Sequence, residues 1–197
     1  TPIQYSTSEN VDGYIDLRTH INYGLPLNFM KCNLNLMGGV SYREQPSLIN
    51  EQKNIASNLG YNAHVVLGSN ISENIDFTLS WGGGFNQADN SLGSQGKNEY
   101  FNHNAEASFK AVFLKGFTFT ASANYTQYIG YTNKYNDSFT LCNAFIGHKL
   151  FKQQLGEIMF GVNDIFNQNK AFSRSTGSGF TQNSWDSVIG RYFIVQF

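Results

Sequence analysis

In the stretch GYIDLRTHINYGL, residues 13–25, mostly apolar side chains alternate with polar or small ones. One side of the stretch carries Ile15, Leu17, Thr19, Ile21, Tyr23 and Leu25, and the other side carries Asp16, Arg18, His20, Asn22 and Gly24. Successive side chains of a β-strand point to opposite faces of a sheet, whereas a helix repeats every 3.6 residues. The stretch therefore predicts a long strand with one apolar face and one polar face.

The same period of two recurs along the whole chain. The expected strands cover residues 13–25, 32–43, 60–69, 75–86, 101–113, 117–125, 138–150, 156–162 and 187–197. The strand at 138–150 has two competing apolar phases, one with Phe139 and Leu141 and one with Cys142 and Ala144, so its facing stays open. No stretch has the pattern of an amphipathic helix. The predicted fold class is all-β, with antiparallel strands in up-and-down order.

A soluble β-sandwich also alternates, so three further features decide between a sandwich and a transmembrane barrel. Several expected strands are much longer than the roughly 5 to 6 residues usual in soluble sheets. Short connections at 26–30, 70–74, 114–116 and 151–156 alternate with mostly long, polar ones at 44–58, 87–98, 130–137 and 163–186. Only 14% of the residues are charged, against roughly 25% in soluble domains. Together these features predict an outer-membrane β-barrel, with lipid on the apolar face and a watery lumen on the polar face.

Composition and motifs exclude several function classes. With 13 Lys and Arg against 14 Asp and Glu, the chain has no basic field to attract nucleic acid. No apolar run approaches the length of a transmembrane helix. The four His and two Cys stand at no recognisable catalytic or metal-ligating spacing, so neither an enzyme nor a cofactor or metal site is expected.

Glycine and proline positions complete the strand assignment. The glycine run at 82–84 lies inside an expected strand and precedes no helix, so it predicts a kink or bulge rather than a phosphate-binding loop. The three prolines, Pro2, Pro26 and Pro46, fall outside the expected strands, as the hydrogen-bonded ladder requires.

The strand count predicts that residues 1–197 are the C-terminal portion of a larger barrel. If the short connections are periplasmic, the first strand begins at the outer surface. A complete bacterial barrel has an even number of strands and both ends in the periplasm. The nine strands and the external start therefore place the earlier strands upstream. A further strand within 163–186, where AFSRSTGSGF could pair, would change the count.

Several segments in this order resemble Bacteroidota TonB-dependent-receptor-like proteins. They are DGYIDLRTHINYGLPL (12–27), LNLMGGVSYREQPSLIN (34–50), GSNISENIDFTLSWGG (68–83), LKGF (114–117), GHKLFKQQLGEIMFGVNDIFNQN (147–169) and RYFIVQF (191–197). VNDIFNQN is similar to the V-x-N-L-F segment near the end of these receptors, with Asp164 and Ile165 departing from it. The resemblance implies a barrel of about 22 strands, an upstream plug domain and a TonB complex that supplies energy for nutrient uptake. A surface lipoprotein is a further candidate partner.

Ligand contacts are expected from lumen-facing charges and from the external loops, because loops on a rigid scaffold carry recognition. The candidate residues are Asp16, Arg18, Arg43, Glu44, Lys53, Glu106, Lys110, Asp164, Lys170 and Arg174. The alternative for the lumen-facing members is that they pair with one another and with a plug. The leading function is the wall and extracellular loops of a TonB-dependent receptor, and the alternative is a non-transporting surface or assembly barrel.

Overall fold

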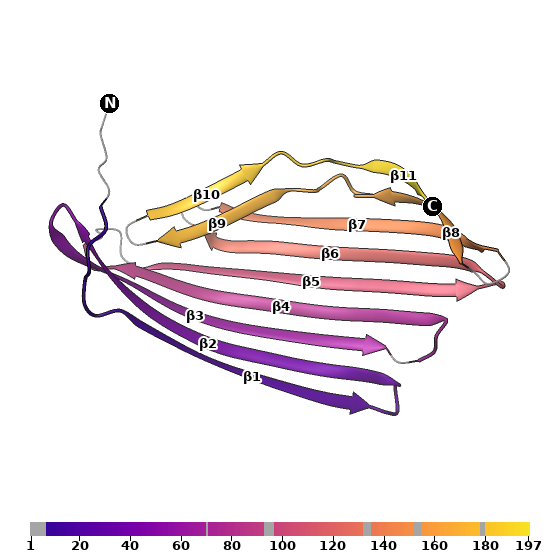
Figure 1. Cartoon of the computed structure of the whole chain (residues 1–197), viewed down its shortest axis with the longest axis horizontal. Coiled ribbons are helices and arrows are strands. Elements are labelled where there is room, and N and C mark those ends of the chain that lie inside the picture. Colours follow the sequence, from indigo (N-terminus) through magenta and orange to yellow (C-terminus); the bar gives the residue numbers. More distant parts are fainter. Residues whose placement is uncertain (1–6, 70, 93–96, 132–134, 152–154, 178–179) are drawn as a thin grey trace.

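The computed structural model of the chain describes residues 7–69, 71–92, 97–131, 135–151, 155–177 and 180–197. The strands, drawn in Figure 1, are β1 (Ile15–Leu27), β2 (Cys32–Ile49), β3 (Gln52–Ser69), β4 (Ile75–Asn90), β5 (Asn98–Phe113), β6 (Phe117–Tyr131), β7 (Tyr135–Leu150), β8 (Gly156–Asn163), β9 (Ala171–Gly177), β10 (Phe180–Asp186) and β11 (Tyr192–Gln196). Among these residues, none forms a helix long and apolar enough to cross a membrane.

One antiparallel sheet dominates the molecule. Its nine strands follow the order β1-β2-β3-β4-β5-β6-β7-β8-β11, so each strand pairs with its neighbour along the chain up to β8. The sheet is not closed, and β1 and β11 form its two edges (Figure 1). The remaining strands, β9 and β10, pair only with each other. The all-β, antiparallel, up-and-down prediction is confirmed, and so are nine strands for the main sheet; β9 and β10, within 163–186, bring the strands of the described residues to eleven.

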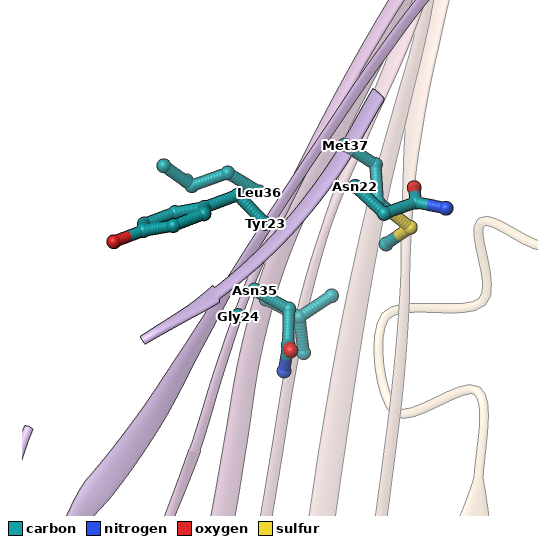
Figure 2. A pocket seen from close by; sticks show the side chains of 7 residues that line it. Asn22, Tyr23, Gly24, Asn35, Leu36 and Met37 are labelled. Carbon is teal, nitrogen blue, oxygen red and sulfur yellow. The ribbon is translucent and has the colours of Figure 1, made fainter. Parts of the chain in front are cut away.

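The register brings the apolar side chains of successive strands to one face. Leu25, Leu34, Leu67 and Leu79 lie opposite one another across β1 to β4. We call this the apolar face and the opposite one the polar face. Figure 2 shows the two faces at β1 and β2, where Tyr23 and Leu36 point to one side of the ribbon and Asn22 and Met37 to the other.

The apolar face is exposed rather than covered by a second layer. The side chains of Leu17, Ile21 and Phe193 are 63%, 70% and 69% exposed. Among the described residues, the only buried hydrophobic ones are Cys32, Ala56 and Ala88. A single sheet with this face in water would present an apolar patch far larger than soluble monomers tolerate.

The pairing of β6 with β7 settles the facing of β7. Ala121 lies opposite Ala144 and Ala123 opposite Cys142, so the phase of Cys142 and Ala144 belongs to the apolar face. The competing phase, which includes Phe145, lies on the polar face. There the Phe145 ring covers Gly161 of β8, where an added Cβ would come within 2.0 Å of the ring carbon Cδ1.

Four of the expected connections are wrong in extent. The one expected over 130–137 is shortened from both sides, because β6 runs to Tyr131 and β7 begins at Tyr135. β2 and β3 are joined only by Asn50 and Glu51, both with positive φ, instead of a loop over 44–58. β4 and β5 likewise extend into the expected loop at 87–98. Within 163–186, β9 and β10 form a hairpin, and the last strand is confined to Tyr192–Gln196. Beyond Glu44, each face of the β2–β3 hairpin mixes polar and apolar side chains: Pro46 and Leu48 share a face with Glu44, and Ile49 shares the other with Gln45 and Ser47. The period of two is therefore lost there, although the ladder continues.

The expectation that prolines avoid strands is also wrong. Pro26 lies in β1, an edge strand, and Pro46 lies in β2 beyond Glu44, the last β2 residue that pairs with β1. Edge positions tolerate proline because the ladder can lack a donor on the open side. The glycine run at 82–84 forms no bulge, since the register with β3 and β5 continues unbroken through it.

Candidate functional site

Asp16, Arg18 and Arg43 meet on the polar face of β1 and β2. The Arg18 guanidinium donates two hydrogen bonds to the Asp16 carboxylate, from Nε to Oδ1 and from Nη2 to Oδ2, both at 2.8 Å. Arg43, opposite Asp16 in the register, places its Nη2 3.1 Å from Asp16 Oδ2. The Tyr14 hydroxyl also donates to Oδ2, at 3.1 Å.

The two arginines of this cluster have more N–H donors than the Asp16 carboxylate uses. One carboxylate faces two guanidinium groups, and the side chains of Arg18 and Arg43 remain 61% and 43% exposed. Exposed ion pairs of this kind contribute little to folding, because solvent screens both charges. Because arginine offers five donors in a planar fork, the unused N–H groups are available to an anionic or hydrogen-bonding partner.

Glu44 and Lys53 lie apart from the cluster. Glu44 is opposite Ile15 and therefore in the phase of the apolar face, where its carboxylate accepts a hydrogen bond from the Tyr42 hydroxyl. The Lys53 ammonium donates to the backbone oxygen of Asp12 at 3.3 Å, which ties the N-terminal segment to β3.

Glu106 and Lys110 are exposed on the polar face of β5. Glu106 lies opposite Ser80 on β4, and Lys110 lies opposite Asp76. Neither forms a salt bridge with any residue that the structure describes. The structure thus brings together three of the predicted charges and leaves these two separate.

Asp164 organises the turn that follows β8. Its side chain is 2% exposed, and its two carboxylate oxygens accept hydrogen bonds from the backbone N–H groups of Gln168 and Asn169 at 2.9 and 3.0 Å. Its own N–H donates to Asn143 Oδ1 at 2.9 Å. The carboxylate that was expected to contact a ligand is therefore fully engaged within the loop.

Lys170 begins the hairpin region and forms an ion pair that the sequence did not indicate. Its ammonium lies 2.8 Å from the carboxylate of Asp137 on β7. Nearby, the Phe172 ring of β9 packs against Tyr128 of β6 at a centroid distance of 5.0 Å. Asp137 was missed because it is 33 residues away in sequence and stands in a polar stretch without alternation. The side chain of Arg174 lies outside the described residues.

The described residues show no grouping that suits metal or covalent chemistry. They contain no cluster of three or more His, Cys, Asp or Glu side chains that could hold a metal ion. A hollow of about 270 Å³ lies at the free edge of the sheet (Figure 2). Its lining includes Tyr23 and Leu36 from the apolar face and Asn22 and Met37 from the polar face, so it is a gap beside an edge strand rather than an enclosed binding cavity.

Residues 2–197 match a known family, described as the outer membrane protein β-barrel family. The chain belongs to that family. This outer membrane β-barrel protein is thus placed in the bacterial outer membrane, as the sequence predicted, and its family is typically non-enzymatic. Comparisons of the β-barrel protein with curated proteins and with solved structures found no match.

Proposed function

We propose that the chain forms wall and extracellular segments of a TonB-dependent receptor that takes up a nutrient across the outer membrane. The observation that carries the proposal is the two-faced sheet, with large exposed apolar side chains on one face and polar, partly charged ones on the other. A wall between lipid and water needs this division, with lipid against the apolar face and the lumen along the polar face.

The open sheet supports a larger barrel. Each edge strand presents backbone N–H and C=O groups without ladder partners, and such groups are very unfavourable against hydrocarbon. We propose that further strands of the same polypeptide pair with β1 and β11 to close the wall. A plug domain inside the barrel and a TonB complex in the inner membrane would then control passage.

The charged residues on the polar side have proposed roles at the ligand or the plug. Arg18 and Arg43 retain unused donors beside Asp16, and Glu106 and Lys110 stand free of salt bridges among the described residues. A surface lipoprotein that delivers ligand to the extracellular hairpins is a further proposed partner.

Uptake measurements test the transport proposal. A deletion strain, the same strain complemented with the full-length protein, and a strain lacking TonB are grown in one rich medium, and the disappearance of medium compounds is measured by mass spectrometry. We expect at least one compound that only the complemented, TonB-containing strain depletes. A medium depleted identically by all three strains contradicts transport and favours the alternative, a non-transporting surface or assembly barrel.

A paired substitution links the transport to the charged cluster. In the same assay, R18A/R43A should slow depletion of that compound, since it removes both guanidinium groups from the polar face. Arg191→Ala is the matched control, because Arg191 is exposed and lies outside the cluster. Equal depletion by both variants would remove the cluster from the proposal without removing transport.

A further inference from the structure

Five polar side chains, four of asparagine and one of histidine, lie together on the polar face over glycines. Asn62 and His64 of β3 flank Gly84 and Gly82 of β4 from one side, and Asn102 and Asn104 of β5 flank them from the other. Asn86 of β4 is the fifth member. We call these five residues the amide shelf.

The glycines let the shelf side chains lie flat. A Cβ added to Gly82 would come within 3.0 Å of His64 Cδ2 and 3.2 Å of Asn104 Oδ1, so both groups already occupy the space above this glycine. At Gly84 the nearest atom would be Asn102 Oδ1, at 3.5 Å. The shelf therefore spans two strand spacings, about 10 Å, with its polar atoms near the level of the backbone.

The shelf has unused hydrogen-bonding capacity. None of its five side chains forms a hydrogen bond with another part of the described chain, although four of them are only partly exposed. By contrast, Asn124 of the neighbouring β6 accepts a hydrogen bond from Thr126. Asparagine presents both a donor and an acceptor, so the shelf offers both kinds of group to a partner in the lumen.

The chemistry of the shelf favours an uncharged partner. No Asp, Glu, Lys or Arg stands among these positions, and the next charge on this face of β5 is Glu106. An anionic ligand would lose hydration here without gaining an ion pair, which is costly, and the nearby carboxylate of Glu106 would repel it. A hydroxyl group both donates and accepts, and therefore matches side-chain amides well.

Aromatic rings border the outer end of the shelf. Tyr128 lies opposite Asn102 in the register, and the Phe172 ring packs on it. Phe172 in turn lies 5.4 Å from the ring of Trp185, whose side chain is exposed. Rings of this kind cover the apolar faces of flat ligands, while amides bond to their polar rims.

We infer that the amide shelf is a binding site for an uncharged, polyhydroxylated ligand of the oligosaccharide class. The inference rests on the proposed transport function, since it names the substrate class of that lumen. The rim of hydroxyl groups bonds to the shelf amides and to His64, and the ring faces pack toward Tyr128 and Phe172.

Calorimetric titration of the purified full-length protein tests the inference. The probes are neutral oligosaccharides (maltohexaose, cellohexaose, xylohexaose and mannohexaose) and acidic oligogalacturonate of the same length. We expect at least one neutral probe to bind, and N102A/N104A to weaken it by about tenfold or more, as the loss of two hydrogen bonds implies. Asn124→Ala is the matched control and should leave binding unchanged.

Three outcomes overturn the inference. Only the acidic probe binds, no probe binds, or a neutral probe binds to N102A/N104A as tightly as to the unsubstituted protein. The variant N102L/N104L, which keeps the branching of the side chain and removes its polar atoms, replaces the alanine pair if that pair fails to fold. Transport is judged separately. If a charged compound is taken up in a TonB-dependent way and N102A/N104A leaves its uptake unchanged, the binding site is refuted and the transport function stands. If a neutral oligosaccharide binds to the shelf but is not taken up, the binding site stands and the transport function is refuted.

Discussion

The turn after β8 depends on one buried carboxylate, and replacing Asp164 tests this directly. In Asp164→Ala the backbone N–H groups of Gln168 and Asn169 lose the acceptors that lie 2.9 and 3.0 Å away. A buried donor left without a partner costs about 1 to 3 kcal/mol. The φ of Asp164 is 53°, a region that Asp and Asn visit more readily than Ala.

The two amides would share the loss, since water reaches part of the loop once it loosens. We therefore expect Asp164→Ala to weaken local protection by about 3 kcal/mol, which is a factor of roughly 150 in amide exchange. Asp164→Asn keeps the backbone preference and one good acceptor, so its effect should be nearer tenfold.

Residue-resolved hydrogen exchange on the full-length protein measures these changes. The amide of Met30 is an internal control, because it donates to the backbone oxygen of Leu27, 3.0 Å away, in the turn between β1 and β2, which does not contact Asp164. If Gln168 and Asn169 exchange no faster relative to Met30 in the alanine variant, the carboxylate does not hold this turn.

Three further outcomes follow from other contacts. Gly161→Ala should lower the urea midpoint of unfolding, because its Cβ would meet the Phe145 ring at 2.0 Å and overpacking costs about 1 to 3 kcal/mol. Adding Phe145→Ala should recover part of this loss of stability. If the effects of the two substitutions are additive, the clash is contradicted. Lys170→Ala should lower the free energy of unfolding by less than about 1 kcal/mol, since the Asp137–Lys170 pair is partly exposed. A double-mutant cycle with Asp137→Ala should give a coupling energy that decreases in high salt. A coupling energy that does not depend on salt would argue against an ion pair. On the apolar face, His103 Nε2 lies 2.9 Å from Gln127 Oε1, while His103 Nδ1 is buried without a partner among the described residues. The double variant H103F/Q127L should therefore be at least as stable as Gln127→Leu alone. A less stable double variant would show that the imidazole contributes more than its hydrogen bond to Gln127.

The sequence predicts those parts of the fold where the two faces of a strand meet different surroundings. Around Leu17 and Ile21 the alternation is complete, and the faces expected there are the faces observed. Beyond Glu44, polar and apolar side chains mix on both faces of the hairpin, so no alternation distinguishes a strand from a loop. The pairing there depends on the turn at Asn50 and Glu51 and on contacts between segments distant in sequence.

Asn54 illustrates such a contact. Its side chain is fully buried, and its Oδ1 accepts hydrogen bonds from the Ser91 hydroxyl at 3.4 Å and from the Leu92 N–H at 3.2 Å. Asparagine at an outer loop position ordinarily indicates exposure, and no local pattern predicts a partner more than 30 residues away.

The candidate site was predictable only where charge made residues conspicuous. The sequence predicts Asp16, Arg18 and Arg43 because each is a charged side chain within a strand whose other residues are mostly uncharged, and the register brings the three together. The shelf residues Asn62 and Asn102 escaped notice, since asparagine is abundant along the chain. Only the strand pairing shows which amides converge over the same glycines.

The ladder between β8 and β11 begins at Asn163 and Tyr192, and it fixes the apolar face of Phe193 and Val195 from that pair onward. The described residues between these two strands do not belong to the main sheet, and β9 and β10 pair only with each other. Insertions or deletions in the β9–β10 hairpin therefore leave the side chains of the main sheet in phase. Relatives that share the sheet can differ in this hairpin, and with it in the surface that it presents.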